Sequence, residues 1–176
     1  GATALNDLRY FRHAALEVAG VPLRAVRLSY VGEAGWELTC PSDQACQLYD
    51  ALRAAGARPA GLFAQTAMRI EKQFLAYGHE LDSDLTPLET GLDFAVAWRS
   101  EFIGKAALLE QRAQAPRQQV VSILLVEAEA QPLGNEPVLA AGDMIGKTTS
   151  AAFGYRLGRP VALAIVDSKL LSENDR

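Results

Sequence analysis

The sequence predicts an α+β fold in two parts, a mixed α+β part of residues 1–115 and a β part of residues 116–176. Three observations support this division. Apolar and polar residues alternate in segments 26–30 and 36–40, which is typical of half-buried strands. Apolar residues recur at the helical period in three segments before residue 116. No helix-period pattern follows Pro116, where β-branched residues become frequent instead.

The expected elements of the first part are bounded by turn and capping residues. Glycines flank a short loop, 32–35, between the two alternating strands, as in a β-hairpin. Ser42 is placed to cap the first helix, and Gly56 and Gly78 are placed to end the first and second helices. After the second helix the sequence predicts a polar loop, a short strand and a third helix. The expected helices are 42–55, 65–76 and 105–114, and the short strand is 94–98.

The second part predicts about four strands, which is few for an independent sheet domain. A β-rich run covers residues 120–126, a hairpin joins 138–139 to 144–145, and a further strand covers 161–166. An incomplete sheet of this kind leaves an unpaired edge, and such edges recruit other chains. We therefore expect a homo-oligomer.

Charge and composition exclude several classes of protein. The formal net charge of −4 argues against a nucleic-acid partner, because phosphate binding requires a basic face. No apolar run reaches the roughly 18 residues of a membrane span, and no signal peptide is visible. We expect no membrane partner and a cytoplasmic location, or the mitochondrial matrix in a eukaryote. The two histidines are isolated from each other and from both cysteines, so no metal site is expected.

The hairpin carries the most informative pair of side chains. If residues 32–35 form the loop, Tyr30 pairs with Glu37 and the two share a face of the sheet. A pterin presents a ring N–H beside an exocyclic amine, and one carboxylate can accept both hydrogen bonds. The alternative is that Glu37 faces solvent and balances the charge of Arg27 across the hairpin.

Two other polar groups have structural interpretations that outweigh functional ones. Arg69, Glu71 and Lys72 on the second helix are expected to form a solvated helix face. A polar cluster follows in the next loop, where a catalytic histidine beside carboxylates is conceivable but a turn rich in backbone-capping residues is favoured. This cluster comprises His79, Glu80, Asp82 and Asp84.

Several ordered segments resemble one protein family. Arg27-Leu-Ser-Tyr-Val-Gly-Glu-Ala-Gly-Trp-Glu-Leu38 is similar to a hairpin of the glycine cleavage T-protein (aminomethyltransferase) family. Gly61-Leu-Phe-Ala-Gln-Thr-Ala-Met-Arg-Ile-Glu-Lys72 resembles the family's next helix. Later segments that resemble its following loop, helix and C-terminal barrel are Tyr77-Gly-His-Glu-Leu81, Thr86-Pro-Leu-Glu-Thr-Gly-Leu92, Phe102-Ile-Gly-Lys-Ala-Ala-Leu108, Gly134-Asn-Glu-Pro-Val-Leu139 and Ile145-Gly-Lys-Thr-Thr-Ser150.

The resemblance implies a partial aminomethyltransferase folate-binding fold followed by a partial C-terminal β-barrel. Within the family the chain is most similar to the C-terminal half of dimethylglycine and sarcosine dehydrogenases. It would then be the tetrahydrofolate-binding portion of an enzyme that passes an amine-derived one-carbon unit to tetrahydrofolate. Glu37 corresponds to the glutamate that binds the pterin ring, and Tyr30 to a tyrosine lining the same pocket. FAD is implied only if an upstream flavin domain exists, and the other partner would be a small methylated amine.

The sequence departs from the family pattern at two places. Gln65 stands where the T-protein has an arginine near the folate. The family's catalytic aspartate lies upstream of the hairpin, and Asp7 is too close to the first residue to be its counterpart. No catalytic residue is therefore assigned, and this piece alone is expected to be inactive. The alternatives are a non-enzymatic folate-binding scaffold or iron–sulfur assembly protein of the same fold, and a purely structural module.

Overall fold

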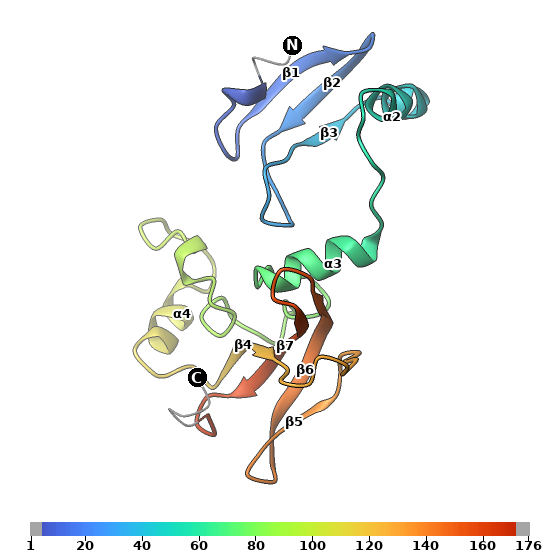
Figure 1. Cartoon of the computed structure of the whole chain (residues 1–176). Helices are drawn as coiled ribbons and strands as arrows, with labels where there is room; N and C mark the ends of the chain where they lie inside the picture. Colours follow the sequence, from blue (N-terminus) through green and yellow to red (C-terminus); the bar gives the residue numbers. More distant parts are fainter. Residues whose placement is uncertain (1–4, 172–176) are drawn as a thin grey trace. The chain divides into compact units, whose positions relative to one another are not determined.

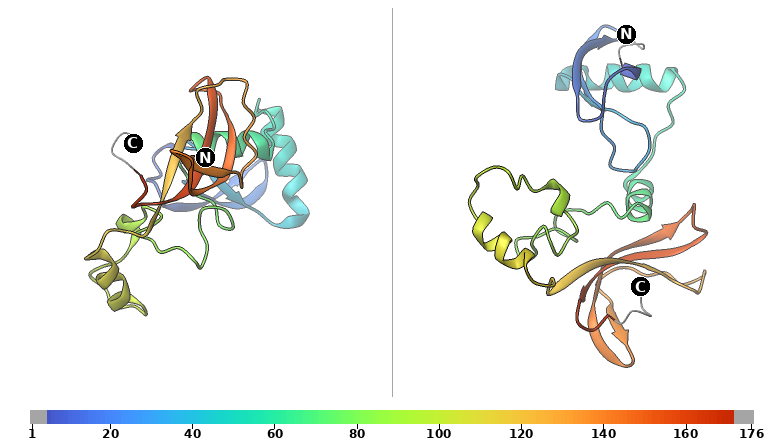
Figure 2. Two further views of the ribbon diagram at one scale, coloured as in Figure 1. Left: turned by 90° about the horizontal axis from the view of Figure 1, so that it is seen from below. Right: turned by 90° about the vertical axis from the view of Figure 1, so that its left-hand side faces the viewer.

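The computed structural model describes residues 5–171 and divides the chain into two compact units, residues 1–65 and 66–176 (Figures 1 and 2). Each unit is described by itself. Strands pair antiparallel in both units, and the helices are separate from the strands along the chain, so the predicted α+β class is confirmed. The predicted domain boundary at residues 115–116 stays a prediction.

The first unit is a three-stranded sheet with one helix. Its strands β1 (His13–Val18), β2 (Val21–Val26) and β3 (Glu37–Thr39) lie in the order β1-β2-β3. Ala19 and Gly20 both have positive φ, 52° and 80°, as a two-residue hairpin turn of type I′ requires. After the short 3₁₀ helix η1 (Ser42–Gln44), helix α2 (Ala45–Ala54) completes the unit.

Helix α2 covers one face of this sheet. Leu48 is buried together with Val21, Leu23 and Ala25 of β2, and these residues form the core of the unit. Because residues two apart in a strand share a face, the alternate residues of β2 face away from this core. The first unit therefore has one covered face and one open face.

Helix α3 (Leu62–Glu71) begins in the first unit and ends in the second. It ends earlier than the predicted 65–76 helix, because Gln73 turns the backbone to a φ of 55°. The 3₁₀ helix η2 (Asp93–Ala95) replaces the strand predicted at 94–98, which is a correction. Trp98 donates its indole N–H to the carbonyl of Asp93 at 3.2 Å, which closes a compact turn where an extended strand was expected.

The second unit is built on a four-stranded antiparallel sheet of order β4-β7-β6-β5 (Figure 1). Helix α4 (Lys105–Arg112) precedes this sheet in the chain. The strands are β4 (Gln118–Leu124), β5 (Pro137–Ala140), β6 (Asp143–Gly154) and β7 (Arg159–Asp167). They agree with the strands predicted after residue 116, although β6 is longer than the sequence pattern indicated.

Strand β7 lies inside this sheet and is apolar on both faces. Val161 and Leu163 pack with Ile70 of α3, whereas Ala164 and Val166 pack with Ile145 on the opposite face. A strand buried on both faces has a nearly continuous apolar sequence, and this explains the run from Val161 to Val166.

Candidate functional site

The hairpin between β2 and β3 has a longer loop than the sequence predicted. Glu37 pairs with Val26, and the predicted pairing of Glu37 with Tyr30 is wrong. The Ser29 hydroxyl accepts hydrogen bonds from the backbone N–H groups of Val31 at 3.3 Å and Glu33 at 3.1 Å. These bonds turn the chain before Tyr30 can join the ladder, so residues 27–36 form the loop.

Glu37 begins β3 and lies on the open face of the first sheet. Its cross-strand partner Val26 pairs in turn with His13 of β1, so the three residues form one row across that face. The side chain of Glu37 is exposed, and within residues 5–171 its carboxylate has no hydrogen bond or ion pair. It is thus an accessible hydrogen-bond acceptor that faces solvent.

Glu37 faces solvent, as the alternative interpretation expected, but Arg27 does not balance its charge. Its guanidinium donates instead to the backbone carbonyls of Leu8 at 2.7 Å and Asn6 at 3.2 Å. Arg27 therefore fastens the segment before β1, and Glu37 remains available to a ligand.

Tyr30 lies in the 27–36 loop and is 37 % exposed. The loop leads directly into β3, so Tyr30 and Glu37 belong to the same hairpin, but they do not face each other across a ladder. The assignment of both residues to a pterin site stays a prediction.

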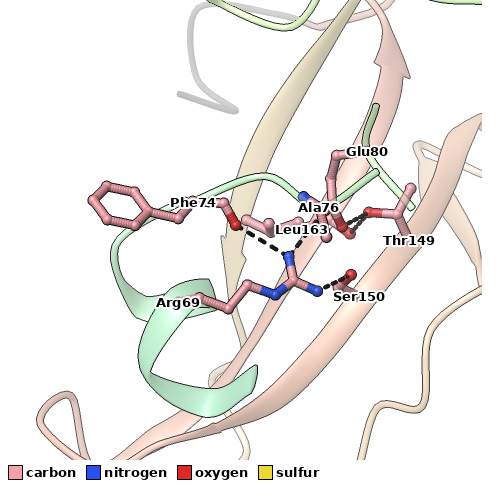
Figure 3. A network of polar contacts seen from close by, with 7 residues as sticks. All are labelled: Arg69, Phe74, Ala76, Glu80, Thr149, Ser150 and Leu163. Atoms are coloured by element: carbon pink, nitrogen blue, oxygen red, sulfur yellow. Dashed lines mark hydrogen bonds and ion pairs between the residues drawn. The ribbon is translucent and has the colours of Figure 1, made fainter. Parts of the chain in front are cut away.

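A buried polar network in the second unit was missed by sequence reasoning (Figure 3). Arg69 was expected on a solvated helix face, but it is only 4 % exposed, and Glu80 of the predicted polar loop is 0 % exposed. Arg69 Nη1 donates to Glu80 Oε2 at 2.9 Å, and Arg69 Nη2 donates to the Ser150 hydroxyl at 2.6 Å. The predictions of a solvated Arg69 and of Glu80 in a polar turn fail for the same reason. A buried charge needs a partner of opposite charge, and each of these two residues is that partner for the other.

The remaining oxygens and donors of this network are also paired. Thr149 donates its hydroxyl to Glu80 Oε1 at 2.6 Å, and the backbone N–H of Ala76 donates to Glu80 Oε2 at 3.0 Å. Burial alone would raise the pKa of Glu80. The hydroxyls of Ser150 and Thr149, the Ala76 N–H and the charge of Arg69 outweigh that effect and hold the pKa below its ordinary value.

The network fixes the turn that follows α3 to strand β6. Three successive N–H groups, those of His79, Glu80 and Leu81, donate to the single carbonyl of Ala76 at 3.1–3.2 Å. Glu80 thereby points inward while His79 stays exposed, so the two do not form a catalytic pair. A run of hydroxyl residues such as Thr148 to Ser150 within a strand is the sequence signal for such a network, because buried hydroxyls need partners.

Glu71 also has a structural contact. Its Oε1 accepts hydrogen bonds from the backbone N–H groups of Arg156 at 2.8 Å and Leu157 at 3.3 Å, in the turn between β6 and β7. The end of α3 is therefore joined to the second sheet through both Arg69 and Glu71.

The described part of the chain has neither a cluster of metal ligands nor a membrane-spanning helix. Among residues 5–171, no three or more histidine, cysteine, aspartate or glutamate side chains lie close enough to hold a metal ion. Across those residues, no helix has both the length and the apolar character needed to cross a bilayer. Both cysteines, Cys40 and Cys46, are free thiols.

Comparisons with known proteins match nearly the whole chain. The GCVT N-terminal domain matches residues 2–100, and the glycine cleavage T-protein C-terminal barrel domain matches residues 118–176. An aminomethyltransferase of Thermosynechococcus vestitus is 37 % identical over 163 residues, which is 92 % of this chain and 44 % of that protein. The mitochondrial dimethylglycine dehydrogenase of Homo sapiens is 35 % identical over 168 residues, 92 % of this chain and 19 % of that protein.

A solved structure gives the same result for the fold. The glycine cleavage system aminomethyltransferase T of Bartonella henselae matches with a TM-score of 0.83 and 25 % identity, over 93 % of this chain and 46 % of that one. The fold is therefore a fragment of the aminomethyltransferase fold, as predicted. The chain spans less than half the length of each of these three proteins.

Proposed function

Because the chain belongs to the glycine cleavage T-protein family, we propose that it is the tetrahydrofolate-binding portion of a one-carbon transferase of the aminomethyltransferase or dimethylglycine dehydrogenase type. In the whole protein this portion would hold the folate that receives an amine-derived one-carbon unit. The proposal concerns binding and orientation, since no catalytic residue is assigned to this chain.

The observation that supports this proposal is the accessible carboxylate of Glu37 on the open sheet face. A carboxylate that accepts two parallel N–H groups binds a planar donor edge with defined orientation, as it does with a guanidinium. The pterin ring offers such an edge, and the exposed ring of Tyr30 in the adjoining loop can line it. The donor chemistry of tetrahydrofolate thus fits the residues that the hairpin presents.

Titration calorimetry with tetrahydrofolate tests the role of Glu37. Glu37→Gln keeps the shape and removes the charge, so affinity is expected to fall at least about tenfold, the effect of losing charge-assisted hydrogen bonds. Glu17→Gln is the matched control, because Glu17 is an exposed carboxylate on the same open face but pairs with Pro22, away from the His13–Val26–Glu37 row. Equal affinity of the wild type and Glu37→Gln would reject Glu37 as the pterin anchor.

A further inference from the structure

The second unit contains a cavity of about 620 Å³ that is separate from the hairpin of Glu37. One wall is the turn around Thr86 and Glu89, and the other is the end of α4 with the segment leading into β4. This volume lies within the range of about 300–1,000 Å³ of small-molecule sites. Two acidic and two basic side chains line it: Asp84, Glu89, Arg112 and Arg117.

Glu89 is a buried carboxylate with a fixed position. It is 8 % exposed, and its Oε2 accepts hydrogen bonds from the N–H and the hydroxyl of Thr86, both at 3.0 Å. Its own N–H donates back to the Thr86 hydroxyl at 3.4 Å, so Thr86 and Glu89 form a capping box around a single helical turn. This explains the Thr-Pro-Leu-Glu sequence and leaves Oε1 with a looser contact, Arg117 Nε at 3.7 Å.

The two arginines differ in how they are held. The guanidinium of Arg112 lies over the Trp98 ring, 4.6 Å from its centroid, and Nη2 is 3.4 Å from Asp93 Oδ2. A stacked guanidinium keeps its plane while its in-plane N–H donors can still bind a carboxylate. Arg117 is 71 % exposed; its Nε makes the long contact to Glu89, and its Nη2 donates to Gln118 Oε1 at 3.4 Å. Both guanidinium groups therefore retain donor capacity at the cavity.

The charges of this cavity select the kind of ligand. Two carboxylates and two guanidinium groups give a formal net charge of zero, so neither a simple anion nor a simple cation satisfies the lining. A ligand carrying both charges does, with its ammonium group toward Glu89 and Asp84 and its carboxylate toward Arg112 and Arg117. We propose that this cavity binds a small zwitterion, a free α-amino acid that is neutral overall. Gln111 and Gln114 on the same wall supply amide groups for a polar side chain.

Two-dimensional amide NMR of the 176-residue chain tests the site with glycine, L-serine and L-glutamine as probes. At up to about 20 mM, well above a dissociation constant of about 1 mM, these are expected to shift the signals of residues 84–89 and 111–117. Acetate and methylammonium, the separate halves of glycine, are expected to leave them unchanged at the same concentration. Arg117→Gln should weaken binding of the best probe at least about tenfold.

The controls separate loss of the site from loss of the fold. Arg117 is mostly exposed, so Arg117→Gln should keep the wild-type melting temperature, and Arg58→Gln removes an exposed arginine of the other unit and should not change binding. The proposal is overturned if no zwitterion shifts these signals at that concentration. It is equally overturned if acetate shifts them with the same affinity, which would indicate an anion site, or if Arg117→Gln binds as the wild type does. Its failure would not affect the role of Glu37, which lies in the other unit.

Discussion

Replacement of Glu80 by glutamine is expected to lower the free energy of unfolding of the 66–176 unit by about 3–5 kcal/mol, the cost of leaving a buried charge without its partner. Glutamine has nearly the same volume, and its carbonyl oxygen can still accept from Thr149. Its NH2 group would then face the donors of Arg69 and Ala76, so the change removes one acceptor together with the charge. Arg69 is 4 % exposed and donates to Glu80 at 2.9 Å, and no solvent replaces the lost carboxylate. A domain stability of about 5–15 kcal/mol makes this a large loss.

The double variant Arg69→Met/Glu80→Leu distinguishes the cost of an unpaired buried charge from the net contribution of the ion pair to stability. When both charges are replaced by apolar groups, no unpaired buried charge remains, so the double variant should lose less than the sum of the two single variants. It still leaves the Ala76 N–H and the hydroxyls of Thr149 and Ser150 without these partners. Some loss should therefore persist.

Urea unfolding followed by tryptophan fluorescence measures these differences. The chain has two tryptophans, one in each unit, and the Trp36→Phe background leaves Trp98 to report on the second unit. Because the folded pKa of Glu80 lies below its ordinary value, the stabilisation is complete above the unfolded pKa of about 4.3 and is lost as pH falls through the folded pKa. The gap between wild type and Glu80→Gln should thus shrink between pH 5 and the acid limit. A loss below about 1 kcal/mol at pH 7, or a gap that widens in acid, would refute the reasoning.

Two further predictions concern the second sheet. Gly146→Ala should destabilise the unit by about 1–3 kcal/mol, because the added Cβ would meet the carbonyl oxygen of Ile165 and lie 2.7 Å from the Cα of Val166. Gly61→Ala, where the added Cβ has no atom within 4 Å, should cost less in the same urea assay. The sheet ends at β5, an edge strand that carries the 60 % exposed Leu139, and we propose that the chain self-associates at this edge. Light scattering should then give a dimer or higher assembly, and a monomer at all concentrations would contradict the proposal.

Sequence patterns correctly predicted the helices and hairpins that are formed by residues close together in the chain. The β5–β6 hairpin turns at Ala141 and Gly142, both with positive φ, where the sequence places small residues and a glycine between apolar pairs. Helix α2 follows the helical period and ends beside Gly56, whose φ is 99°. In these elements, the residues that form the structure are neighbours in the sequence.

The buried network could not be predicted in this way, because its partners are distant in the chain. Arg69 and Glu80 are 11 residues apart, and Arg69 and Ser150 are 81 residues apart. A charged residue on an amphipathic helix is ordinarily solvated, and only the burial of both partners reverses that expectation. The prediction of a strand at 94–98 is wrong for a similar reason. The hydrogen bond from the Trp98 indole to the carbonyl of Asp93 stabilises a turn, and the alternation of residue types does not reveal it.

The prediction for Glu37 is less sensitive to the register error than the prediction for Tyr30. The predicted pairing had Glu37 opposite Tyr30, and the observed pairing has it opposite Val26, an even number of residues away. Since side chains alternate between faces with a period of two, an even shift leaves Glu37 on the same face as Val26 in both registers. Leu38 then points inward to pack with Ala25, and this contact keeps Glu37 on the open face. Tyr30 lies instead in the loop, where the hydrogen bonds to Ser29 determine its position and strand alternation does not.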